Sequence, residues 1–226
     1  MDLELNNKTA IVCGCTQGIG LGIAKELAIN NVNLILIARN EVALASIKDS
    51  LHNKENHHYI CVDFSEPNSL KEKLTRFLDL KKIDVDILIN NTGGPSAGPI
   101  EMAEPSEFLK GFNMHIICSQ IITQLILPGM KKNNFGRIIN IISTSVKAPI
   151  SGLGVSNTIR GAMANWSKTL ANETGRFGIT VNNVLPGFTK TDRLKSLFKN
   201  KSIKEKVSVE DVEKRALQTI PIGRFG

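Results

Sequence analysis

Tyrosine and tryptophan are nearly absent from this sequence of 226 residues, which contains one of each, Tyr59 and Trp166. A reaction that needs a phenol from this chain must therefore use Tyr59. Cysteine is also scarce, with four residues, and Cys13 and Cys15 are too close together for the usual zinc pair. We therefore predict no metal site, and we interpret the cysteines as small reduced core residues, which favours a cytoplasmic protein.

Long apolar runs are absent as well. The most apolar stretch, residues 116–127, is interrupted by serine, threonine and glutamine, so we expect no membrane association. The first residues do not combine a basic segment with an apolar one, which argues against a signal peptide. No linker, repeat or composition break divides the chain, and we expect a single domain over residues 1–226.

Positive charge is in excess, with 28 basic and 21 acidic side chains and a net charge of +7. The excess is concentrated in residues 190–215. Two interpretations remain open: a solvated helical face, or a substrate lid near residues 188–218 that presents a basic lip to an anionic substrate or an acidic acyl carrier. Nucleic-acid binding is not expected, because no aromatic residues alternate with these lysines.

Apolar strand-like runs alternate with helical periodicity along the whole chain. Six such runs are predicted as strands, at residues 9–13, 33–38, 59–64, 85–90, 137–142 and 179–185. Helices are predicted between them, including long ones over residues 105–130 and 155–174. Because the strands are apolar on both faces, the pattern predicts an α/β fold with a doubly wound parallel sheet and helices on both faces.

A glycine-rich turn follows the first predicted strand and opens the first predicted helix. Glycines in such a turn allow a ligand to approach the backbone at a helix N-terminus, where free N–H groups favour a pyrophosphate. The alternative is a glycine-lined turn without a ligand. The predicted cofactor-binding residues of this turn are Gly14, Thr16, Gln17, Gly18, Ile19 and Gly20.

The second predicted strand is followed by Arg39 rather than by the carboxylate that would favour NAD(H). An arginine can pair with a 2′-phosphate, so we expect NADP(H) in preference to NAD(H). The alternative for Arg39 is a solvated side chain at a strand end. Asp63, at the end of the third predicted strand, is a candidate for the adenine amino group or for capping the following turn.

Together these motifs resemble the short-chain dehydrogenase/reductase family, over nearly the whole chain. The segment Asn90-Asn91-Thr92-Gly93 resembles the element that closes the family's fourth strand, and the run 136–143 resembles its fifth strand with the catalytic serine, here Ser143. The resemblance implies a Rossmann-type sheet. It also implies cofactor contacts from Asn91, Gly93, Pro186, Gly187 and Thr191, and a homodimer or homotetramer. The family usually continues past Gly226 into a seventh strand, so either the sheet lacks that strand or a tail is missing.

The resemblance breaks at the catalytic residues. The family's tyrosine and lysine fall at Ser156 and Arg160, and its helix asparagine falls at His115. Tyr59 is expected on the third strand, in the wrong half of the sheet. A histidine has a reference pKa near ~6.5, so His115 is a candidate to pass a proton through water to Ser156 or Ser143. The alternative is a histidine that only packs.

The sequence therefore predicts an NADP(H)-dependent oxidoreductase with an atypical proton donor, acting on a carbonyl or alcohol. The substrate is expected to be a small molecule or linked to an acyl carrier. The alternative is a catalytically inactive NADP(H)-binding sensor or scaffold. Loss of a general acid typically costs about 10²–10⁴ in rate, which is why both remain open.

Overall fold

The computed structural model describes residues 3–226, which form one parallel sheet, the helices around it and a small helical unit. The strands are β1 (Thr9–Cys13), β2 (Asn33–Ala38), β3 (His58–Cys61), β4 (Ile87–Asn90), β5 (Gly136–Ile141) and β6 (Ile179–Val184). The α-helices are α1 (Gly18–Ile29), α2 (Glu41–Ser50), α3 (Pro67–Lys81), α4 (Pro105–Phe112), α5 (Cys118–Lys132), α6 (Gly154–Thr174), α7 (Asp192–Glu205) and α8 (Val209–Gln218).

The sheet has six strands in the order β3-β2-β1-β4-β5-β6, and every pair is parallel. The chain runs from β1 outward to β3 and then returns to β4 on the other side of β1. Ligands of such sheets bind in the crevice at the carboxyl ends of the two strands where the order reverses, here β1 and β4. The predicted doubly wound Rossmann-type fold is confirmed.

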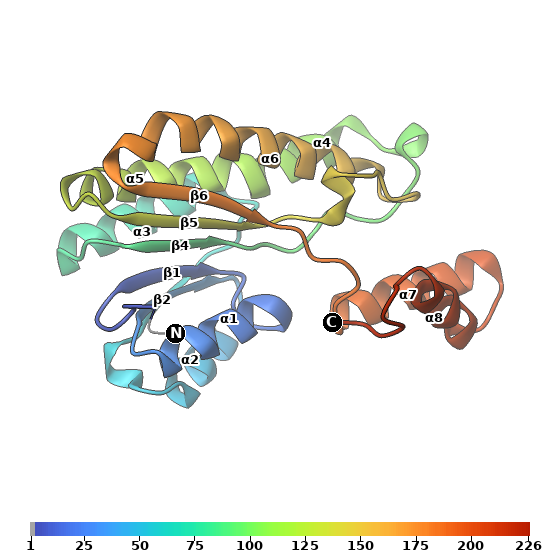
Figure 1. Ribbon diagram of the computed structural model, residues 1–226, viewed down its shortest axis with the longest axis horizontal. Helices are drawn as coiled ribbons and strands as arrows, with labels where there is room; N and C mark the ends of the chain where they lie inside the picture. Colours follow the sequence, from blue (N-terminus) through green and yellow to red (C-terminus); the bar gives the residue numbers. More distant parts are fainter. Residues whose placement is uncertain (1–2) are drawn as a thin grey trace. The chain divides into compact units, whose positions relative to one another are not determined.

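Helices cover both faces of the sheet (Figure 1). On one face, α1 and α2 bury Ala24, Ala28 and Leu44 against the strands. On the other, α3 and α5 contribute Leu70, Ile122 and other apolar side chains to a second core. The strands are apolar on both faces because both are covered, and this continuous burial explains why their sequences do not alternate.

The long helix expected over residues 105–130 is interrupted. A π-helical turn at Asn113–Ile117 separates α4 from α5. Such a turn inserts one extra residue into the helical ladder and changes which side chains face the core, and it is often found at functional sites. It places His115 inside the protein, at 4% exposure, and leaves Asn113 exposed.

The structure divides into two compact units, Met1–Leu185 and Pro186–Gly226, which are described separately. In the second unit, α7 and α8 pack on each other through Leu194, Phe198, Val212 and Ala216. The last residue pairs with the start of this unit, because Gly226 N donates to the Phe188 carbonyl over 3.0 Å. The expected single domain and the lid role of residues 188–218 stay predictions.

Candidate functional site

The glycine-rich turn between β1 and α1 leaves no room for side chains at two positions. Gly14 has a φ of +59°, and a Cβ there would collide with the Asn91 carbonyl. A Cβ on Gly20 would collide with the Gly14 carbonyl. Asn91 Nδ2 also donates to the carbonyls of Cys13 and Gly14, over 3.2 and 3.1 Å. The turn is therefore held tightly against the end of β4.

The N-terminus of α1 keeps its backbone donors available. Gln17 occupies the N-cap position, and its side chain makes no capping hydrogen bond. Gly18, the first helical residue, has a φ of +55°. Its neighbours Thr16 and Ile19 are half-buried. Uncapped N–H groups at a helix N-terminus, next to a turn without side chains, form a cradle suited to a pyrophosphate.

Arg39 extends into solvent directly after β2, with 77% of its side chain exposed. Its nearest charged neighbour is Asp63, whose Oδ2 lies 4.0 Å from Nη1. Asp63 also accepts hydrogen bonds from the backbone N–H and the hydroxyl of Ser65, over 2.8 and 2.9 Å. These bonds, with the charge of Arg39, lower the pKa of Asp63. Asp63 thus caps the turn that follows it and keeps a negative charge beside Arg39.

Ser143 and Ser156 supply hydroxyl groups after β5 and in the first turn of α6. The Ser143 Oγ accepts a hydrogen bond from Ser145 N over 3.0 Å, so its own hydrogen remains available for donation. No residue of the described chain, 3–226, hydrogen-bonds the half-buried Ser156 hydroxyl. Because α6 packs against the turn Thr144–Val146, both hydroxyls belong to the carboxyl end of the sheet.

Arg160 is turned inward on α6. Its side chain is buried, with the residue 9% exposed, and Nη1 donates to the Ile141 carbonyl over 3.0 Å. The same nitrogen lies 3.4 Å from His115 Nδ1. The guanidinium thus places a fixed positive charge beneath the end of β5.

His115 contacts Thr92 as well as Arg160. The Thr92 Oγ1 lies 2.7 Å from His115 Nδ1. Burial and the charge of Arg160 lower the pKa of His115 to about 3, although a backbone hydrogen bond at Gly93 opposes the shift. The imidazole is therefore neutral at pH 7. A small cavity of about 10 Å³ borders these side chains, near the lower limit for one water molecule.

Two residues of this region escaped the sequence analysis as functional candidates. In the sequence Thr92 is only one residue of the Asn-Asn-Thr-Gly motif, whereas in the structure its hydroxyl contacts His115. Asn140 is fully buried in β5. Its side chain accepts a hydrogen bond from Asn90 Nδ2 and donates one to Ser167 Oγ, both over 2.8 Å. A polar asparagine inside the apolar run Ile-Ile-Asn-Ile-Ile is the sequence signal that could have indicated it, because a buried amide needs hydrogen-bond partners.

The remaining predicted residues lie elsewhere. Tyr59 is on β3, the edge strand farthest from β5, as expected. Pro186, Gly187 and Thr191 belong to the second unit, where Thr191 caps α7 by accepting from Leu194 N over 3.3 Å. Among residues 3–226, no group of three histidine, cysteine or acidic side chains could hold a metal ion. No helix in that range is long and apolar enough to cross a membrane.

Comparison with known proteins gives concordant matches. Residues 8–202 match the family model described as short chain dehydrogenase. D-beta-hydroxybutyrate dehydrogenase of Cupriavidus necator is 31% identical, over 98% of this chain and 86% of that protein. The NADPH-dependent reductase BacG of Bacillus subtilis is 28% identical, over 98% and 86% of the two chains.

Comparison with solved structures also finds similar proteins. The structure of L-sorbose reductase from Gluconobacter frateurii, complexed with NADPH and L-sorbose, superimposes with a TM-score of 0.91. Its sequence is 26% identical to this chain, and the match covers 100% of this chain and 87% of that one.

Proposed function

The chain belongs to the short-chain dehydrogenase family, and from that premise we propose that it is an oxidoreductase that uses NADP(H) in preference to NAD(H) to interconvert a carbonyl and an alcohol. The single observation that carries the proposal is the cradle formed by Gly14, Gly20 and the uncapped start of α1, with Arg39 at the end of the next strand. The relative BacG is an NADPH-dependent reductase, and the structure of L-sorbose reductase contains NADPH, which supports this choice of cofactor.

The cofactor residues have distinct tasks in this proposal. The turn at residues 14–20 would receive the pyrophosphate on backbone N–H groups, because no side chain occupies the approach. Arg39 would bind the 2′-phosphate by a charge-assisted hydrogen bond, because its exposed guanidinium only approaches Asp63, to 4.0 Å, through one nitrogen. Asn91 and Gly93 would border the cofactor where β4 ends, and Pro186, Gly187 and Thr191 would contact its nicotinamide side.

A bound nicotinamide would supply the hydride to a carbonyl or accept it from an alcohol. We propose that Ser143 and Ser156 donate hydrogen bonds to the substrate oxygen, since both hydroxyls keep a hydrogen available. The buried charge of Arg160 would favour negative charge that develops near the end of β5. Arg160 does not release a proton at any working pH, so it cannot replace an acid.

His115 remains our candidate relay for the proton, with a constraint. Because its pKa is about 3, an imidazolium is not part of the cycle at neutral pH. The neutral ring would have to accept a proton on one nitrogen while it releases one from the other, with the proton carried to Ser156 or Ser143 through the Thr92 hydroxyl or a water. A His115→Ala variant with unchanged turnover would eliminate this relay.

A second candidate is an NADP(H)-binding sensor or scaffold without turnover. One observation favours this candidate. Of the three catalytic candidates other than Ser143, namely Ser156, Arg160 and His115, none exchanges a proton near neutral pH. For the oxidoreductase, we propose a substrate that is a small molecule or is linked to an acyl carrier. We also propose that the chain forms a homodimer or a homotetramer.

Turnover separates the two candidates. NADPH oxidation would be followed with a panel of aldehydes, ketones and 3-oxoacyl thioesters, for the native chain and for Ser156→Tyr/Arg160→Lys. Activity of the native chain is the expected result. Activity only in the double variant would show that the native chain binds cofactor without redox chemistry.

A further inference from the structure

The amino-terminal edge of the sheet, opposite the candidate cofactor site, carries cations that lie on phenylalanine rings. Lys8 Nζ and Arg137 Cζ lie 4.1 and 4.2 Å from the centre of the Phe135 ring. Lys131 Nζ and Arg176 Cζ lie 5.0 and 4.8 Å from the centre of the Phe177 ring. These distances are within the range of cation–π attraction, so the rings hold the charges in place.

We call these six residues the amino-edge patch: Lys8, Lys131, Phe135, Arg137, Arg176 and Phe177. They come from four separate places in the chain, namely the residue before β1, the end of α5, the start of β5 and the turn between α6 and β6. Parallel strands bring these places together, because the strand starts and the preceding helix ends lie at one edge. Lys132, at the end of α5, adds a further exposed cation.

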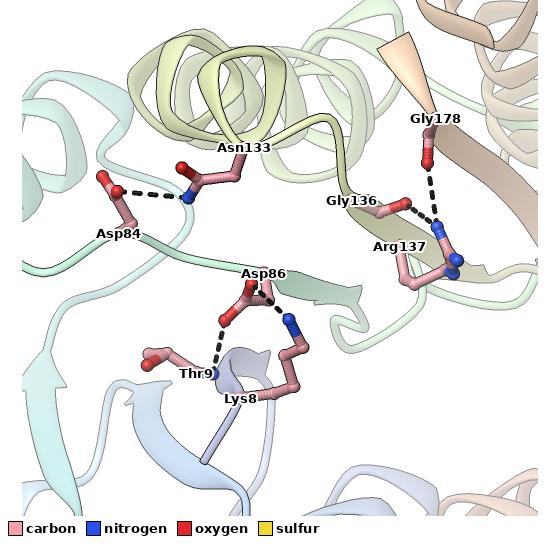
Figure 2. A network of polar contacts seen from close by, with 8 residues as sticks. All are labelled: Lys8, Thr9, Asp84, Asp86, Asn133, Gly136, Arg137 and Gly178. Atoms are coloured by element: carbon pink, nitrogen blue, oxygen red, sulfur yellow. Dashed lines mark hydrogen bonds and ion pairs between the residues drawn. The ribbon is translucent and has the colours of Figure 1, made fainter. Parts of the chain in front are cut away.

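Arg137 is the most firmly fixed of these cations (Figure 2). Its Nη1 donates to the carbonyls of Gly136 and Gly178, over 2.8 and 3.0 Å. Its Nε and Nη2 make no hydrogen bond with any residue in the range 3–226. A guanidinium that is locked at one nitrogen and open along the Nε–Nη2 edge matches the two oxygens of a carboxylate.

The nearby carboxylates are already engaged. Asp86 accepts from Thr9 N over 2.9 Å and from Lys8 Nζ over 3.4 Å (Figure 2). Asp84 accepts from Asn133 over 3.2 Å. Within the described part of the chain, Lys131, Lys132, Arg137 and Arg176 form no ion pair. Among the described residues, these four cations therefore outnumber the one carboxylate nearby, Asp84, that is not in an ion pair.

We propose that the amino-edge patch docks an acidic segment of a partner protein, with one carboxylate on the open edge of Arg137 and others beside Lys131 and Arg176. Charge complementarity and the preorganised guanidinium carry this assignment. A single-stranded nucleic acid fits less well, because both rings already hold cations and offer no stacking platform to a base. The patch uses no residue of the cofactor site, so the inference is independent of the redox function.

Fluorescence anisotropy of the full chain with a fluorescein-labelled peptide of alternating glutamate and glycine tests the proposal. The test variants are Arg137→Gln and Lys131→Ala/Arg176→Ala. The matched control, Lys195→Ala/Lys199→Ala, removes two charges from α7 in the other unit. We expect each test variant to weaken binding about tenfold, and the control to change it less than about twofold, at roughly physiological salt.

The double variant keeps the test valid if Arg137→Gln unfolds, because Lys131 and Arg176 are exposed and leave the backbone contacts intact. A single-stranded oligonucleotide of equal charge is the second probe. The proposal is overturned if the peptide does not bind, if the α7 control loses as much affinity as the patch variants, or if the oligonucleotide binds the patch more tightly than the peptide.

Discussion

The Thr92 hydroxyl oxygen lies 2.7 Å from Nδ1 of His115, and the Arg160 guanidinium approaches the same nitrogen to 3.4 Å. An arginine can only donate, so Nδ1 must accept and the ring proton must be on Nε2. Protonating Nδ1 would place its hydrogen against the guanidinium. Burial of the imidazole is the larger cause of the lowered pKa of His115, and the charge of Arg160 beside Nδ1 adds to it, so that the pKa falls to about 3.

The neutral His115 makes stability depend on pH. The unfolded chain protonates this imidazole below about pH 6.5, whereas the folded chain does so only near pH 3. Between these values the unfolded state binds more protons, so the free energy of unfolding falls as the pH falls. From pH 7 to pH 5 the contribution of His115 falls by about 2 kcal/mol.

Urea denaturation at pH 7 and pH 5 checks this prediction. Between the two pH values, the free energy of unfolding of His115→Gln should fall by about 2 kcal/mol less than that of the native chain. His52→Gln, which removes an exposed histidine, is the control and should behave like the native chain. Equal pH dependence of the native chain and His115→Gln would contradict the lowered pKa.

Removal of Arg160 should weaken the fold. In Arg160→Met, the buried Ile141 carbonyl loses the hydrogen bond that Arg160 Nη1 donates to it over 3.0 Å. We expect the free energy of unfolding to fall by about 1–3 kcal/mol, measured by urea denaturation. Lys168→Met changes an exposed cation of the same helix and should have little effect. A stable Arg160→Met protein would show that the buried guanidinium is dispensable.

Two glycines of α1 should respond oppositely to alanine. In Gly20→Ala the new Cβ meets the Gly14 carbonyl and the Asn91 side chain, so both stability and NADPH binding should be lost. In Gly22→Ala nothing lies within 4 Å of the new Cβ, and helix propensity favours alanine by about 1 kcal/mol. Thermal denaturation and NADPH titration of both variants test this. Unimpaired NADPH binding by Gly20→Ala would argue against a ligand in the turn.

Arg39 should determine the choice between the two cofactors. Arg39→Ala removes the charge that would bind the 2′-phosphate, and a charge-assisted hydrogen bond contributes about 1.5–3 kcal/mol. We expect NADPH affinity to fall about tenfold or more and NADH affinity to change little, as measured by isothermal titration calorimetry. Arg76→Ala, on the exposed face of α3, is the control. An equal loss for both cofactors would assign Arg39 a structural role.

The strands and the glycine turn could be predicted because their signals are local. The run Asn33–Ala38 is apolar at almost every position and forms the strand β2 with the same bounds. Arg39 follows directly from its end. Such features depend on burial and on backbone freedom, and residues that are neighbours in the sequence indicate both.

The interior of the site could not be predicted in this way. Helical periodicity continues without a break through residues 105–130, so the π-helical turn at Asn113–Ile117 left no sequence signal. That turn decides that His115 faces the core. The inward direction of Arg160 depends on the Ile141 carbonyl, which is distant in sequence. Contacts of this kind arise from the packing of α6 against the sheet rather than from residue spacing.

This chain should bind NADP(H) through the turn at residues 14–20 and Arg39, and titration of the native protein with NADPH and NADH, followed by cofactor fluorescence, measures that binding. We expect saturable binding of both cofactors, with NADPH bound at least about tenfold more tightly, which corresponds to about 1.4 kcal/mol. Absence of saturable NADPH binding, or tighter binding of NADH, would contradict it.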